Sequence, residues 1–159
     1  MAVTSSSMEH RPTTDNGAPS MCGHQLELTR TMRLSEWWSY CGDWYEENTN
    51  ITIQDFQDFP LSNGFNKGDI ILLRGPRDLD IGDIIVFQSG KEHPIIHRVV
   101  DINDKITTKG DNNPGLIRDS ELDEENIPEQ AIIGKAYARI PYLGYIKIWF
   151  TQFIELFTN

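Results

Sequence analysis

Long apolar runs, basic residues and cysteines are all scarce in this sequence of 159 residues. No stretch reaches the roughly 20 apolar residues that a membrane-spanning helix needs. Lys and Arg number 14 against 24 Asp and Glu, which gives a formal net charge of -10. Because so acidic a surface repels phosphate backbones, nucleic acid is not an expected partner.

The cysteines are too few for a metal site. Cys22 and Cys41 are the only ones, and neither a CxxC motif nor a Cys/His metal spacing surrounds them. They are either two buried thiols in a reducing compartment or a disulfide in an oxidising one, and the sequence leaves both open. No metal or cofactor is predicted.

From Gly68 onward, short apolar segments alternate with turn residues. The segments are rich in Ile and Val, are bounded by Gly, Pro, Asn and Asp, and lie at 69–75, 82–90, 93–103, 104–111 and 131–141. This spacing is typical of an antiparallel sheet or barrel. Strands do not alternate with helices, which argues against a doubly wound α/β fold. The sequence predicts a mainly β protein with antiparallel sheets or a partly open barrel.

Residues 11–64 follow a different pattern. The stretch 32–48, "MRLSEWWSYCGDWYEEN", predicts a short helix with a Trp-rich face. We interpret 11–64 as a partly helical insertion or cap within a single domain of residues 1–148. Residues 149–159 are interpreted as an amphipathic segment or a truncated anchor. The acidic run at 121–129 is expected to be a solvated loop or edge.

The segment "PIIHRVV" places a histidine inside an apolar strand. Because side chains alternate across a strand, Ile95, His97, Val99 and Asp101 are expected to share one face. One interpretation of His97 is a partly exposed residue of an edge strand. The other is a general base, since imidazole titrates near neutral pH and can accept a proton from a hydroxyl.

Two carboxylates downstream are candidates to hold that imidazole. Asp111 and Asp119 lie in "TTKGDNNPGLIRDSE". A carboxylate next to a histidine selects its tautomer and stabilises its charged form. The alternative is that both belong to ordinary solvated turns.

The order of the motifs resembles that of type I signal peptidases. Ser-x-Ser-Met, two Gly-Asp strands, His-Arg-Val-Val, Lys-Gly-Asp-Asn-Asn and Ile-Gly-Lys-Ala-Tyr followed by Ile-Pro-Tyr-Leu-Gly appear in the family's order. The resemblance is to the archaeal and endoplasmic-reticulum branch, over 4–10 and about 65–148. It implies the antiparallel, partly open barrel of that family and leaves 11–64 uncovered.

The resemblance also implies site residues. Ser7 of "SSSM" is the implied nucleophile, and His97 of "HRV" is the implied base where bacterial members use a lysine. Asp119 is the implied orienting acid and Asp111 a supporting one, an order that the longer spacer leaves open. The backbone N–H of Ser7 and the hydroxyl of Ser5 are the implied oxyanion donors.

Two features depart from the family pattern. His10 stands where a proline commonly follows the motif, which makes it a rival base for Ser7. The insertion at 11–64 replaces a short connection, and we expect it to shape the substrate groove.

By this resemblance the chain is a membrane-associated serine endopeptidase that removes signal peptides from exported preproteins, with its active site on the extracytoplasmic face. The family carries a transmembrane helix before the serine, so we expect the anchors to be missing or truncated here. A competing interpretation is a non-catalytic β-rich module that binds a peptide or protein through Trp37, Trp38 and Trp44. A self-cleaving repressor-type peptidase would need a lysine base and a DNA-binding segment, and neither is apparent. The oligomeric state is left open.

Overall fold

The computed structural model describes residues 1–14, 17–27 and 29–142. The elements in chain order are β1 (Ser20–Met21), β2 (His24–Gln25), α1 (Leu34–Asn48), α2 (Ile53–Asp58), β3 (Ile70–Arg74), β4 (Ile84–Phe87), β5 (Ile95–Ile102), β6 (Ile106–Lys109), a 3-10 turn (Glu129–Ala131) and β7 (Ile132–Ile140). The segment 149–159, which we interpreted as an anchor, lies outside the described residues. Within the described ranges, no helix has both the length and the apolarity to cross a membrane.

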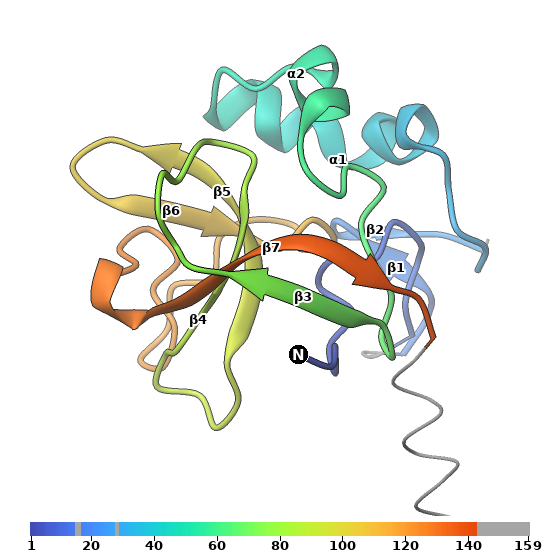
Figure 1. The fold of residues 1–159 in the computed structure, drawn as a ribbon. Coiled ribbons are helices and arrows are strands. Elements are labelled where there is room, and N and C mark those ends of the chain that lie inside the picture. The colour runs from blue at the N-terminus through green and yellow to red at the C-terminus, as the bar shows by residue number, and fades with distance from the viewer. Residues whose placement is uncertain (15–16, 28, 143–159) are drawn as a thin grey trace, which may run out of the picture.

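The strands after Gly68 form one five-stranded antiparallel sheet in the order β3-β7-β4-β5-β6 (Figure 1). Strands β1 and β2 pair in a separate two-stranded antiparallel sheet. The prediction of a mainly β fold with antiparallel sheets is therefore confirmed. Each predicted apolar segment contains one strand of the large sheet, because Gly, Asn and Asp between the segments permit the turns.

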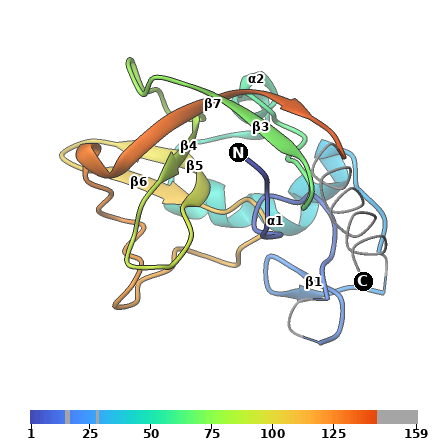
Figure 2. The same ribbon diagram turned by 60° about the horizontal axis from the view of Figure 1, so that its bottom comes forward.

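Both faces of the large sheet are covered. In β4, Ile84 and Val86 pack in a cluster with Met8 of the N-terminal segment, whereas Ile85 and Phe87 pack in a second cluster on the other face. A strand buried on both faces needs no polar alternation, which explains the continuous apolar run. Figure 2 shows the N-terminal segment beside β3, where Ala2 and Ile70 form an isolated bridge.

The Gly-Asp turns that precede β3 and β4 share one geometry. Gly68 and Gly82 have positive φ angles of 90° and 95°. The carboxylates of Asp69 and Asp83 each accept a hydrogen bond from the backbone N–H three residues earlier, at 2.9 and 2.8 Å. The side chain thus satisfies an amide that the turn leaves unpaired.

Helices α1 and α2 of the insertion lie together over the β5–β6 side of the sheet (Figure 1). Their apolar faces form a cluster with Val100 of β5. Trp37 is fully buried and Trp38 is 8% exposed, so both belong to the core and not to a binding surface. Helix α2 begins with a capping box in which the Thr52 and Asp55 side chains bind each other's backbone N–H.

The structure resolves the question of the cysteines. Cys22 and Cys41 form a disulfide, which ties the loop after β1 to the middle of α1. Both cysteines of the sequence are therefore oxidised, as expected for a protein in an oxidising compartment.

Candidate active site

The serine motif lies in a segment that is held by backbone hydrogen bonds before and after the motif. Upstream of it, the backbone N–H of Val3 donates to the Asp69 carbonyl at 2.9 Å. Downstream, Met8 is 1% exposed and its carbonyl accepts from the Phe65 N–H at 3.0 Å. Ser7 lies in the turn between these anchors, and backbone pairing keeps its neighbours from fraying.

Ser7 is half-buried at the edge of a small pocket. Its Oγ lies 3.3 Å from the Oγ of Ser5, and its carbonyl accepts a hydrogen bond from the Asn112 N–H at 2.7 Å. The pocket has a volume of about 360 Å³. Its lining comes from the serine segment, the insertion, Lys67 and the 112–114 loop: Thr4, Ser5, Ser6, Ser7, Thr13, Ser20, Met21, Cys22, Gly23, Lys67, Asn112, Asn113 and Pro114.

His97 of β5 forms a buried pair with a carboxylate that the sequence analysis did not select. Its Nδ1 lies 2.5 Å from Oε1 of Glu124, and the side chains are 4% and 0% exposed. The other carboxylate oxygen accepts from the backbone N–H of Ile117 at 2.5 Å. Because an ionised carboxylate only accepts, a neutral imidazole bonded to it carries its proton on Nδ1 and has Nε2 as the acceptor. This is the arrangement that a general base requires.

Asp119, which we predicted to orient His97, lies elsewhere. Its side chain is 47% exposed and pairs with Lys91 at 3.6 Å. Its Oδ1 accepts from the backbone N–H groups of Glu121 and Leu122, both at 2.8 Å. Asp119 therefore closes its own loop, as turn aspartates commonly do, and Glu124 takes the place beside the imidazole.

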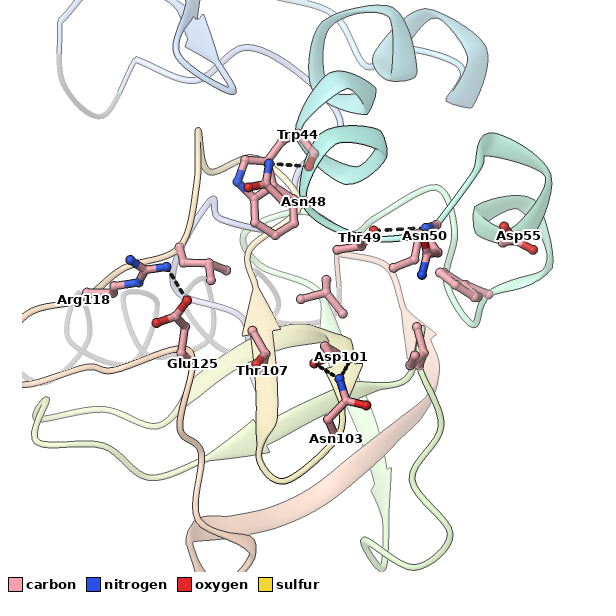
Figure 3. Close-up of a pocket in the computed structure, with 15 residues that line it drawn as sticks. Trp44, Asn48, Thr49, Asn50, Asp55, Asp101, Asn103, Thr107, Arg118 and Glu125 are labelled. Carbon is pink, nitrogen blue, oxygen red and sulfur yellow. Dashed lines mark hydrogen bonds and ion pairs between the residues drawn. The ribbon is translucent and has the colours of Figure 1, made fainter.

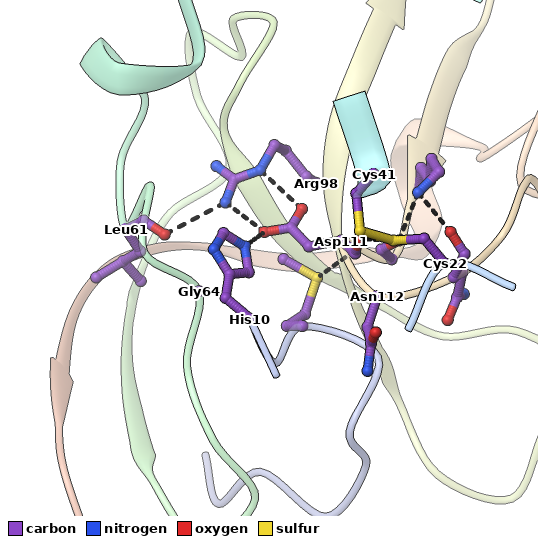
Figure 4. A network of polar contacts seen from close by, with 12 residues as sticks. His10, Cys22, Cys41, Leu61, Gly64, Arg98, Asp111 and Asn112 are labelled. Carbon is purple, nitrogen blue, oxygen red and sulfur yellow. Dashed lines mark hydrogen bonds and ion pairs between the residues drawn. A yellow bond between two sulfur atoms is a disulfide. The ribbon is translucent and has the colours of Figure 1, made fainter. Parts of the chain in front are cut away.

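Asp111, which we predicted as a support, contacts the neighbour of His97 in sequence and not His97 itself. Figure 4 shows its carboxylate between Arg98 and His10. Arg98 donates from Nε to Oδ1 at 3.0 Å and from a terminal nitrogen to Oδ2 at 2.8 Å. Tyr45 of α1 donates to Oδ1 at 3.4 Å. Burial alone would raise the pKa of Asp111, but the Arg98 charge holds it well below its usual range.

His10, the rival base, is buried, and its Nε2 is engaged by a carboxylate. Its Nε2 lies 3.1 Å from Oδ2 of Asp111, and its ring stacks on Trp37 with centroids 4.0 Å apart. Burial lowers the pKa of His10 and outweighs the opposing effect of Asp111. A neutral ring that donates from Nε2 fits these contacts. His10 is therefore a core residue and does not face the Ser7 hydroxyl.

The 110–113 loop lies next to both the Ser7 segment and His97. Asn112 holds the Ser7 carbonyl, and a Cβ built on Gly110 would lie only 2.9 Å from Nε2 of His97. Lys109 fastens the loop by donating from Nζ to the carbonyls of Gly110 and Asn113 at 3.0 and 2.7 Å. Burial lowers the pKa of Lys109 to about 8. No hydrogen bond joins Ser7 to His97 within the described residues, where Ser7 Oγ pairs with Ser5.

The sequence carried a weak signal for Glu124. It lies in the acidic run 121–129, which we expected to be solvated. In the structure Leu122 and Glu124 are buried, at 2% and 0% exposure, while Asp123 between them is exposed. That alternation is typical of a strand-like segment beside a sheet. Backbone bonds confirm the placement, because Thr108 of β6 donates to the Glu124 carbonyl at 2.8 Å.

A larger pocket, of about 880 Å³, lies between the insertion and the β5–β6 hairpin (Figure 3). An ion pair between Arg118 and Glu125 lines one side. Neither Ser7 nor His97 is among its lining residues. The described part of the chain contains no group of three or more His, Cys, Asp and Glu side chains placed to hold a metal ion.

Curated relatives of this chain are catalytic subunits of the signal peptidase complex. SEC11 of Colletotrichum graminicola is 36% identical over 105 residues, which cover 58% of this chain and 60% of the relative. SEC11 of Lachancea thermotolerans is 32% identical over 153 residues, which cover 80% of this chain and 86% of the relative. SEC11 of Plasmodium falciparum is 28% identical over 104 residues, 58% of this chain and 55% of the relative.

The chain spans about three fifths of the length of the first of these relatives. No protein-family model and no solved structure matches the chain.

Proposed function

The chain belongs to the family of signal peptidase complex catalytic subunits, and on that premise we propose that it is a serine endopeptidase that removes signal peptides from exported preproteins. The observation that carries the proposal is the 2.5 Å pair between His97 and Glu124. It leaves a ring nitrogen free as an acceptor beside the loop that binds the Ser7 carbonyl.

In the proposed mechanism, Ser7 Oγ attacks the scissile carbonyl carbon while Nε2 of His97 takes its proton. The resulting imidazolium then donates this proton to the leaving amine, and water repeats the cycle on the acyl-enzyme. Glu124 keeps the proton of the resting imidazole on Nδ1 and stabilises the imidazolium. Ser7 and His97 come into hydrogen-bond reach when substrate binds, since such contacts are often long in unliganded enzymes.

The negative oxygen of the tetrahedral intermediate would be stabilised by the serine segment itself. We assign this role to the backbone N–H of Ser7 and to the hydroxyl of Ser5, whose Oγ lies 3.3 Å from that of Ser7. Loss of one such donor costs on the order of 10² to 10³ in rate. Asp111 would act indirectly. It would hold Arg98 in place, and with it the strand that carries His97.

We further propose that residues 1–148 work as one peptidase domain, with 11–64 inserted in it. The substrate would lie as an extended strand beside the sheet, with a small side chain before the cleaved bond. Membrane association, an extracytoplasmic active site and assembly with other subunits of a complex would follow from the family.

The decisive experiment replaces the nucleophile and the base separately. Ser7→Ala and His97→Ala, each in the full chain in its native membrane, should abolish cleavage of a preprotein, because each removes an atom that the chemistry uses. Ser120→Ala and His24→Ala are matched controls on exposed residues and should cleave normally. Near-full activity of Ser7→Ala or His97→Ala would show that the replaced residue is not the nucleophile or the base, whereas a chain that never cleaves would favour a non-catalytic binding module.

A further inference from the structure

We infer that helix α1 of the insertion is a positioning element for Ser7, acting through His10 on one side and through the Cys22–Cys41 disulfide on the other. The inference rests on the proposed role of Ser7 as nucleophile. By this inference, the 11–64 insertion holds the serine segment at a set distance from the strand that carries His97.

The first connection is a stack of rings. The His10 imidazole lies parallel to the Trp37 indole of α1, with an interplanar angle of 3°. The His10 carbonyl accepts from the Met32 N–H at 2.8 Å, just before the helix. On its other side the ring abuts Gly64, where an added Cβ would lie 2.6 Å from Cδ2. His10 is 1% exposed, so its ring is packed on all sides, and Trp37 of α1 covers one face.

The second connection runs through the disulfide (Figure 4). Cys41 of α1 is bonded to Cys22, whose backbone N–H donates to the Asn112 carbonyl at 3.1 Å. The Asn112 N–H in turn donates to the Ser7 carbonyl at 2.7 Å. Cys22, Asn112 and Ser7 line the same pocket. The disulfide therefore reaches the nucleophile in two hydrogen-bonded steps.

The two connections act at different points of the segment. Asn112 holds Ser7 itself, and His10 holds the chain three residues later. His10 also bonds to Asp111, which binds Arg98, the residue next to His97. Helix α1 thereby sets the serine segment relative to the β5 strand. Catalytic groups must lie within about 0.5 Å of their working positions, and a misplacement of 1 Å can cost about 100-fold in rate.

Amide hydrogen exchange tests the disulfide connection without any assay of activity. Cys22→Ser combined with Cys41→Ser, or reduction of the wild-type protein with a phosphine, should accelerate exchange of the Asn112 N–H. Amides of β4, which pair only within the sheet, should stay protected and serve as the internal reference. Unchanged exchange at Asn112 in the cysteine-free protein would overturn the inference, whether or not the chain proves to be a peptidase.

Kinetics of paired tryptophan variants test the stacking connection. Trp37 and Trp38 are both buried indoles of α1, but only Trp37 stacks on His10. Trp37→Leu should lower kcat by about 100-fold with little change in KM, whereas Trp38→Leu should keep kcat per folded molecule. Equal kcat values for the two variants, each corrected for its folded fraction, would overturn the inference.

A pair of His10 variants keeps this second test decisive if Trp37→Leu does not fold. His10→Phe retains a flat ring against Trp37, whereas His10→Ala removes it. We expect His10→Phe to restore most of the kcat that His10→Ala loses. If both lose kcat equally, the stack does not position Ser7.

Discussion

The protein contains two buried pairs of imidazole and carboxylate that differ in a third partner. His97 lies 2.5 Å from Glu124, and within the described residues no Lys or Arg forms an ion pair with that carboxylate. His10 lies 3.1 Å from Asp111, whose charge is already matched by the Arg98 guanidinium at 2.8 Å.

This difference decides what each imidazole can do. The Glu124 carboxylate can hold the Nδ1 proton of His97 and face the imidazolium that forms when Nε2 takes a proton, as in a catalytic triad. A proton added to His10 would create a second cation beside Arg98 in a fully buried site, and burial lowers the pKa of His10. The same residue types thus form the base that we propose at one place and a buried structural ring at the other.

A change of Glu124 tests the difference between the two pairs most directly. Glu124→Gln should lower kcat by on the order of 10⁴, because the amide no longer fixes the proton on Nδ1 or stabilises the imidazolium. Steady-state cleavage of a signal-peptide substrate measures this, with thermal unfolding to check the fold. Asp119→Asn is the matched control and should leave kcat close to the wild-type value. The assignment of Glu124 fails if Asp119→Asn shows the larger loss.

The next effect is on stability, at the other pair. Arg98→Met should lower the free energy of unfolding by about 3 to 5 kcal/mol, because Asp111 is left buried without its counter-charge. Arg118→Met is the control, since its ion pair with Glu125 lies at the surface and is worth at most about 1 kcal/mol. Urea unfolding of both variants measures the difference. A loss at Arg98 no greater than that at Arg118 would contradict the role given to this cluster.

A glycine behind His10 provides a smaller test of the same region. Gly64 has a φ of 64°, and an added Cβ would overlap the Met8 carbonyl oxygen and approach the His10 ring. Gly64→Ala should therefore cost about 1 to 3 kcal/mol of unfolding free energy. Gly75 has no atom within 4 Å of an added Cβ, so Gly75→Ala should stay within about 0.5 kcal/mol of wild type. Similar losses in both variants would show that the contact at His10 is not tight.

Much of the fold could be predicted because its signals are local. Turn residues separate the apolar segments, Gly68 and Gly82 adopt the positive φ that glycine permits, and the helix at 34–48 follows its Trp-rich pattern. Trp37 and Trp38, in the first turns of this helix, belong to the core, although the sequence left a binding role open for them.

The acid at His97 could not be predicted, because it depends on contacts between distant segments. Glu124 is buried only because residues 117–127 run beside β6, where Ile127 donates to the Ile106 carbonyl at 3.0 Å. Order along the chain favoured Asp119 instead, and that residue closes a turn. The link from His10 to Asp111 was equally hidden, since it joins residues that are 101 positions apart.

The smallest predicted effect is the pH dependence of stability, and its sign follows from the burial of His10. The pKa of His10 in the folded protein lies below the ordinary value of 6.5, which the unfolded chain retains. Between these values the unfolded state binds more protons, so the free energy of unfolding rises with pH in this window and falls as the solution is acidified. His10→Gln keeps a donor for Asp111 but cannot titrate, so its stability should fall less steeply from about pH 7 to about pH 5. Urea titrations across this range measure the slopes, and equal slopes would mean that His10 binds its proton equally well in the folded and unfolded states.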